Sequence, residues 1–133
     1  MNKRDLLNTL YKECALSPED IHKHKHYVII TRGGIEKIQY AKNIIVNFEV
    51  VRCDESFAAV KATGTMSKDE NTIERQETYG SASVETSQNK YYLEMAEKRA
   101  LSRIVLKLTK AYSMGVFGED EADDFKQATL QTS

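Results

Sequence analysis

The sequence predicts an α+β domain built from an antiparallel β-meander of four to five strands, a long helix packed across one face and a short N-terminal helix. Three observations lead to this fold. Residues 87–112 carry a helical pattern of apolar side chains with no Gly or Pro to interrupt it. Residues 44–79 contain alternating apolar and polar positions separated by short polar turns. The strands follow one another while the helices stay apart in the sequence, which is typical of an α+β domain.

A short amphipathic helix is expected at the N-terminus. Five apolar side chains recur at helical spacing in residues 3–16: Leu6, Leu7, Leu10, Tyr11 and Cys14. A second helix start follows at 17–20, with Ser17 as N-cap, Pro18 in the first helical position and Asp20 as the acid three residues on. At most one turn fits there, because residues 27–31 are β-branched and aromatic and predict a strand.

Three histidines alternate with two lysines between these segments. Alternating imidazoles can bind a metal, but no carboxylate or Cys stands at ligand spacing, and the lysines would repel a cation. We therefore interpret this stretch as a basic loop or strand edge, formed by His22, Lys23, His24, Lys25 and His26.

The predicted meander begins with Arg32-Gly33-Gly34 as a turn and residues 35–39 as a short strand. Residues 44–51 alternate as a half-buried strand, and residues 57–66 form the next one. The second strand is rich in Ala and Gly, which indicates that a helix packs closely over it. Residues 67–71 form a hairpin loop, and residues 72–79 form a polar strand at an edge or with one wet face.

The long predicted helix sorts its charges. Arg99, Arg103, Lys107 and Lys110 fall on an arc beside the apolar one. This stripe is either a solvated charged face or a surface that contacts phosphates. Glu97 falls near the middle of the apolar arc, so we expect a basic partner from a strand, such as Arg52 or Arg75.

Charge is distributed unevenly along a chain of 133 residues with a net charge of −1. Residues 87–112 carry +4, and residues 113–133 carry −4. Three interpretations of the acidic segment stay open: it starts a short helix, it docks on a partner through its one aromatic side chain, or it screens the basic helix until an anionic ligand displaces it. Its members are Glu119, Asp120, Glu121, Asp123, Asp124 and Phe125.

Length and composition predict one domain over residues 1–126, followed by a flexible end at 127–133. No apolar run is long enough to cross a membrane, and the N-terminal residues lack a signal-peptide core. Cys14 and Cys53 belong to no metal or redox spacing, so reduced thiols and a cytoplasmic location are expected.

The helix and the residues before it resemble a known family. The matching positions on the helix are Ala96, Glu97, Lys98, Arg99, Ala100, Leu101 and Arg103. Together with a preceding Tyr79-Gly80-Ser81 turn and the order of elements over residues 26–118, they resemble the phage single-strand annealing proteins of the Erf, Sak and Redβ types.

The resemblance implies a non-enzymatic protein that binds single-stranded DNA and anneals complementary strands without ATP or any other cofactor. It further implies a ring or filament of identical subunits, in the cytoplasm of a bacterial host if the protein comes from a phage. Phosphate contacts are expected from Lys98, Arg99, Arg103, Lys107 and Lys110. Base stacking is expected from Tyr79, Tyr91 and Tyr92, which could equally be core residues.

Two other function classes stay open. A protein-interaction module, such as an inhibitor or assembly adaptor, fits the near-neutral net charge. A small nuclease is the less supported class, because no Ser/His/Asp or Cys/His arrangement can be assigned and Glu97 has no second carboxylate in register. Neither a P-loop nor a GxGxxG motif occurs.

Overall fold

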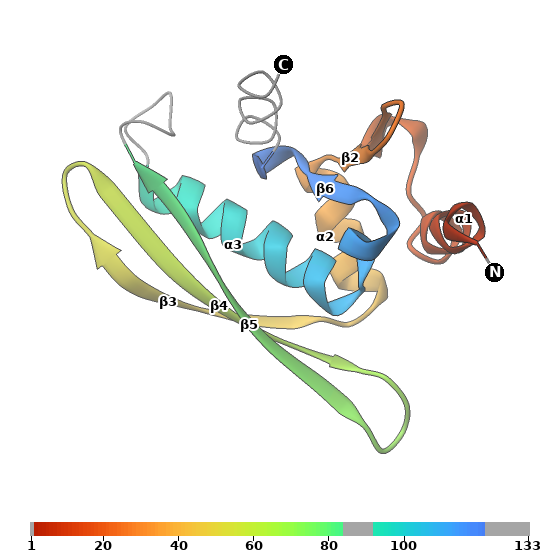
Figure 1. The fold of residues 1–133 in the computed structure, drawn as a ribbon. Helices are drawn as coiled ribbons and strands as arrows, with labels where there is room; N and C mark the ends of the chain where they lie inside the picture. The colour runs from red at the N-terminus through yellow and green to blue at the C-terminus, as the bar shows by residue number, and fades with distance from the viewer. Residues whose placement is uncertain (1, 84–91, 122–133) are drawn as a thin grey trace.

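The computed structural model describes residues 2–83 and 92–121, and within them three α-helices accompany two three-stranded sheets (Figure 1). The elements are α1 (Lys3–Glu13), a 3-10 turn η1 (Pro18–Asp20), β1 (Ile21–Lys23), β2 (Val28–Ile30), α2 (Arg32–Ala41), β3 (Ile45–Cys53), β4 (Phe57–Ser67), β5 (Ile73–Ser83), α3 (Tyr92–Leu108), η2 (Ala111–Met114), β6 (Val116–Gly118) and η3 (Glu119–Glu121). The predicted α+β class with a helix across one sheet face is confirmed.

The meander has three strands, in the order β3-β4-β5, and all are antiparallel. Its register pairs Val60 of β4 with Val50 of β3 on one side and Gly80 of β5 on the other. β5 extends beyond the predicted strand and takes in Tyr79-Gly80-Ser81, which the sequence had suggested as a turn. The close approach of α3 explains the glycine, because a Cβ on Gly80 would lie 2.3 Å from the carbonyl oxygen of Ala96.

The predicted turn at 32–34 and strand at 35–39 are wrong, because these residues form α2. Thr31 caps this helix, and its hydroxyl accepts a hydrogen bond from the Gly34 amide at 3.1 Å. Ile35 and Ile38 are fully buried three residues apart, which is helical rather than strand spacing. Gly34 is a packing glycine, since a Cβ there would lie 2.5 Å from Cγ2 of Ile30.

The predicted count of four to five meander strands is corrected by a second sheet in the order β1-β2-β6. β2 pairs antiparallel with β1 and parallel with β6, so that Val28 lies opposite Val116. The residues between them include the whole meander and α3. Because β6 is only three residues long, alternation along the chain gives no sign of this pairing.

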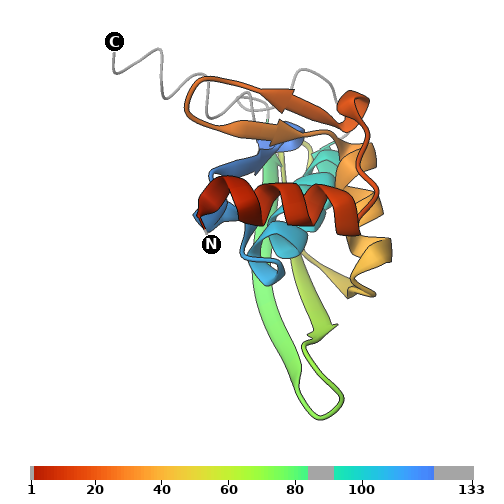
Figure 2. The same cartoon turned by 90° about the vertical axis from the view of Figure 1, so that its right-hand side faces the viewer.

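Helix α3 lies between the two sheets, with the meander on one side and α2 and the small sheet on the other (Figures 1 and 2). Its buried positions Ala96, Ala100, Ile104 and Leu108 recur every four residues. A Cβ on Gly64 of β4 would lie 2.6 Å from Ile104, so the small residues of β4 and β5 let the helix approach the sheet. Glu97 is exposed and not on the apolar arc as expected, since the buried stripe runs one position earlier.

The remaining expectations are settled in part. The predicted N-terminal helix is confirmed as α1, and the single turn after Ser17 as η1. Cys14 is buried, Cys53 is exposed, and both are free thiols. Over the described residues, no helix combines the length and the apolar character needed to cross a membrane. Residues 84–91 and 122–133, which hold Tyr91, Asp123, Asp124, Phe125 and the end at 127–133, lie outside the described chain.

Candidate nucleic-acid interface

Three basic side chains of α3 form a regular row along β5, which we call the cationic ladder. Arg99 Nη1 donates to the Ser81 carbonyl at 2.7 Å. Arg103 Nη1 donates to the Tyr79 carbonyl at 2.7 Å. Lys107 Nζ donates to the Glu77 carbonyl at 3.1 Å. The cationic ladder therefore consists of Arg99, Arg103 and Lys107.

The regularity follows from the geometry of the two elements. Four residues of α-helix advance about 6 Å along its axis, and two residues of a strand advance about 6.7 Å. α3 and β5 run in opposite directions, so each step of four on the helix meets every second carbonyl of the strand. β5 is an edge strand, and these carbonyls point away from β4. The ladder therefore supplies hydrogen-bond donors to backbone carbonyls that an edge strand would otherwise leave without a protein partner.

Arg99 is the buried member of the ladder. Only 3% of its surface is accessible, and its Nε also donates to the backbone carbonyl of Asp120 at 3.2 Å. The predicted phosphate contact of Arg99 stays a prediction, and the burial of its side chain argues against it. The helical angle alone placed it on the charged arc, but the chain after β6 returns and covers this end of the helix.

The other two members lie at the surface: Arg103 is half-buried and Lys107 is exposed. The Glu77 group that Lys107 contacts is a neutral carbonyl, so the bond positions the ammonium without cancelling its charge. Among the described residues, neither Lys107 nor Lys98 forms an ion pair with a carboxylate. Lys98 is half-buried, one position before Arg99.

Lys110 does not belong to the ladder. Helix α3 ends at Leu108, and Lys110 has the left-handed φ of 61° at the entry to η2. It lines a hollow of about 600 Å³ between α1, the β4–β5 hairpin and the end of α3. The predicted arc is therefore broken after Lys107, because the chain leaves the helix there.

The predicted stacking residues have different environments. Tyr79 is 53% exposed. Its ring lies on the face of the meander opposite α3, since the neighbouring Gly80 faces the helix, and its cross-strand neighbour on that face is Lys61. Tyr92 is half-buried and packs against the core, which is the alternative that the sequence left open. Tyr91 lies outside the described residues.

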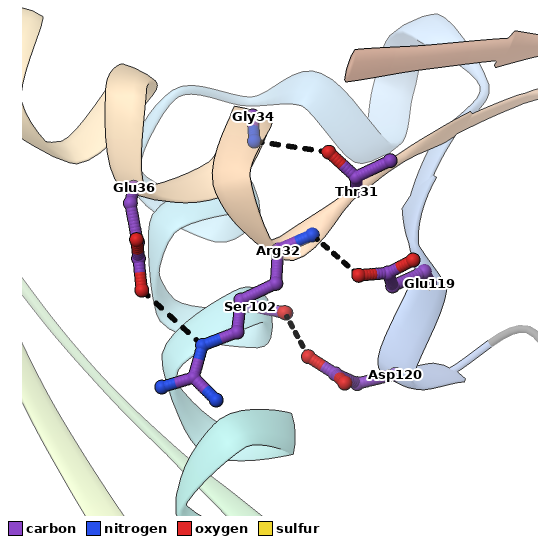
Figure 3. A network of polar contacts seen from close by, with 7 residues as sticks. All are labelled: Thr31, Arg32, Gly34, Glu36, Ser102, Glu119 and Asp120. Carbon is purple, nitrogen blue, oxygen red and sulfur yellow. Dashed lines mark hydrogen bonds and ion pairs between the residues drawn. The ribbon is translucent and has the colours of Figure 1, made fainter. Parts of the chain in front are cut away.

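The first acids of the C-terminal segment bind the protein itself (Figure 3). Glu119 Oε1 accepts a hydrogen bond from the Arg32 amide at the start of α2, at 2.7 Å. Asp120 Oδ2 accepts one from the Ser102 hydroxyl of α3, at 3.1 Å. This part of the segment forms a single 3-10 turn that ties α2 to α3.

The environment of Asp120 disfavours its charge. Burial raises the pKa of this carboxyl above the usual value, and the nearby Glu119 raises it further. The hydrogen bond from Ser102 and the charges of Arg32 and Lys98 lower the pKa in part. The raised pKa means that the ionised Asp120 carboxylate is less stable in the folded turn than in water, so its charge favours unfolding of the turn.

The histidines, cysteines and acids in the described part of the chain do not gather into a metal site. No group of three or more His, Cys, Asp or Glu side chains there is arranged to hold a metal ion. His24 instead stacks on Tyr27, with ring centroids 4.5 Å apart.

No family model matches the chain, and neither the curated proteins nor the solved structures contain a match. The geometry and the resemblance therefore carry the functional argument. Sequence reasoning found the basic stripe but missed its contact with β5. The one available signal was the spacing of four between Arg99, Arg103 and Lys107, facing an expected edge strand.

Proposed function

We propose that the protein binds and anneals single-stranded DNA, without ATP and without enzymatic turnover, as a homo-oligomer. The observation that carries this proposal is the position of Lys107 and Tyr79 at one margin of the molecule. Lys107 is an exposed cation held over the edge of β5. Tyr79 is an exposed ring two residues along the same strand, on the adjoining open face. A cation row beside an aromatic ring suits a single strand, whose phosphates and bases need both contacts.

The ladder favours phosphate binding rather than simple solvation. A flexible Lys or Arg loses conformational entropy when a phosphate fixes it. Here the β5 carbonyls already fix the side chains of Arg103 and Lys107 in a row, so part of that cost is met in the free protein. The step of four residues on α3 spaces the two side chains by about 6 Å along the helix axis.

A single subunit offers few such contacts, and this supports the oligomer. Each phosphate neutralised on a single strand contributes only about 0.7 to the slope of log K against log salt. Two or three contacts therefore give weak binding at physiological salt. Identical margins repeated in one particle raise the affinity through effective concentration. This is the physical reason to expect annealing by a multimer.

The proposal is tested by fluorescence anisotropy with a labelled single-stranded oligonucleotide across a range of salt concentrations. We expect binding at low ionic strength that weakens linearly in log–log form as salt rises. Annealing is then followed with two complementary labelled strands in the absence of ATP. The proposal fails if binding is undetectable at low salt, or if binding is present and insensitive to salt.

A protein-interaction module is the second candidate, and one observation favours it. β3 exposes apolar side chains along an edge that no described strand covers. Binding to another protein that is unaffected by Lys107→Ala, together with an absence of DNA binding, would favour this function over annealing.

A further inference from the structure

The two edges of the meander differ in their backbone partners. The outer carbonyls of β5 accept hydrogen bonds from Arg99, Arg103 and Lys107. The outer edge of β3 receives no hydrogen bond from any described residue along its nine residues. A long edge strand of this kind is normally protected by lysines, proline, a β-bulge or a covering segment. β3 contains neither Lys nor Pro and carries one bulge, between Val50 and Arg52.

β3 exposes apolar side chains on both faces of the sheet. Ile45 lies on the open face and is 65% exposed. Val50 and Phe48 lie on the α3 side, opposite buried Val60 and Ala62, yet they remain 53% and 40% exposed because the helix covers β4 and β5 instead. Exposure on both faces of one strand indicates that its partner approaches edge-on and continues the sheet.

A β-bulge gives this edge a self-complementary charge pattern. Glu49 lies opposite Lys61 of β4, and Arg52 lies opposite Ala59, with Val51 as the extra residue. Lys61 and Ala59 are two residues apart and share the open face. The bulge therefore places Glu49 and Arg52 on one face although they are three residues apart. Within its own chain the Arg52 guanidinium pairs with Asp54 at 2.9 Å and remains largely exposed. Two copies of β3 in antiparallel register then set each Glu49 against Arg52 of the other copy as a second carboxylate partner, with Val50 and Val51 between the two contacts.

We propose that β3 is the contact through which two copies of this chain associate, in an antiparallel β3–β3 pair about a two-fold axis. A second copy is the matching partner because the strand complements its own charges. It also has only β3 to offer, since its β5 is closed by the ladder and each strand of its other described sheet has three residues. The interface joins two three-stranded sheets into one of six strands.

This inference specifies the self-association within the proposed function, but its evidence and tests do not involve DNA. A two-fold contact closes at two copies, so a ring or filament requires a second contact elsewhere. Failure of DNA binding would leave the dimer intact, and failure of the dimer would leave binding at Lys107 measurable. The two outcomes are therefore distinguishable.

The first experiment measures the mass of the full chain by sedimentation equilibrium without nucleic acid. Val50→Lys places a charge at the centre of the edge, and Ile73→Lys is the matched control at another exposed apolar site, on the β4–β5 hairpin. We expect even-numbered assemblies based on a dimer for the wild type and the control, and a monomer for Val50→Lys. Circular dichroism checks that all three proteins are folded. A monomeric wild type, or a multimer that Val50→Lys leaves unchanged, overturns the proposal.

The second experiment tests the register. The proposed pairing sets Phe48 opposite Cys53 of the other copy, and both side chains lie on the α3 side, opposite Ala62 and Ala58. A Phe48→Cys variant should therefore form a covalent dimer with native Cys53 under a mild oxidant. The variant that also carries Cys53→Ser should stay uncross-linked, since Cys14 is buried. A Phe48→Cys protein that gives no covalent dimer, or a double variant that cross-links equally well, overturns the register.

Discussion

The guanidinium of Arg99 joins Ser81 of β5 to the C-terminal turn from a buried position. Its Nη1 donates to the Ser81 carbonyl at 2.7 Å, and its Nε donates to the Asp120 carbonyl at 3.2 Å. Three segments far apart in the sequence therefore depend on one side chain. Arg99 is a structural member of the ladder, whereas Lys107 at the other end is exposed.

Arg99→Met is expected to destabilise the protein. The aliphatic part of the side chain is retained, but two half-buried hydrogen bonds from a charged donor are lost. Each such bond contributes roughly 1.5–3 kcal/mol. We expect the free energy of unfolding to fall by about 3 kcal/mol, measured by urea denaturation. Lys107→Met is the control, with an expected change within about 0.5 kcal/mol because the side chain is exposed. Equal losses of unfolding free energy in the two variants would contradict the distinction between a structural Arg99 and an exposed Lys107.

The sequence predicted the meander strands and α3 because their periodic patterns are long. It missed α2, because Gly33 and Gly34 are signs of a turn unless the packing of Ile30 against Gly34 is known. It could not predict the pairing of β2 with β6, which depends on residues 88 positions apart, as for Val28 and Val116.

The sequence predicted only part of the candidate site, again because the missing information lies in contacts between distant segments. The angular position of a residue on a helix shows which side chains share a face. It does not show which neighbour covers that face. Arg99 and Lys110 therefore looked equivalent to Lys107, but the returning chain buries Arg99, and the helix ends before Lys110.

Gly80→Ala is expected to disrupt the packing of α3 on β5. The added Cβ would lie 2.3 Å from the Ala96 carbonyl oxygen and 2.4 Å from the Ala100 amide nitrogen. Both are backbone atoms of α3, so neither can move away unless the helix itself shifts. We expect a loss of about 3 kcal/mol or more, from overpacking and lost helix contacts, measured by thermal and urea unfolding.

Gly33→Ala is the matched control for that variant. The nearest atoms to its Cβ would be 3.8 Å away, which is ordinary contact. Because Gly33 lies in a helix with no positive φ, alanine should leave the stability unchanged or raise it by up to about 1 kcal/mol. A mild effect at Gly80 comparable to that at Gly33 would mean that α3 does not approach β5 so closely.

Lys107→Ala and Tyr79→Ala separate the two kinds of contact with single-stranded DNA. Loss of one phosphate contact should reduce the slope of log K against log salt by about 0.7. Loss of a stacked ring should weaken binding by about 1–3 kcal/mol with little change in that slope. Lys12→Ala is the control, because this exposed lysine lies on α1, a helix that forms no part of the β5 margin. If Lys12→Ala changes binding as much as Lys107→Ala, the margin of β5 is not the interface.

Asp120→Asn is expected to stabilise the protein at neutral pH. Burial raises the pKa of Asp120 in the folded state above its value in the unfolded chain, so the folded state binds the proton more tightly. Stability from this group is therefore greatest in acid and falls as the pH rises through the raised pKa. Asparagine keeps an oxygen that accepts the hydrogen bond from the Ser102 hydroxyl, and it carries no charge at any pH. The gain over wild type should be present at neutral pH and disappear as the pH falls towards the usual carboxyl range.

Asp69→Asn provides a control of opposite sign. A hydrogen bond from the Asn71 amide holds the pKa of Asp69 below its usual value, so this carboxylate favours the folded state above that range. Asp69→Asn should therefore be neutral or destabilising at neutral pH, with the difference again vanishing in acid. Urea denaturation of both variants over a series of pH values makes the comparison. If Asp120→Asn instead loses stability at neutral pH, the carboxylate must gain more from Arg32 and Lys98 than burial costs it, and the turn would be held by charge rather than by the Ser102 bond.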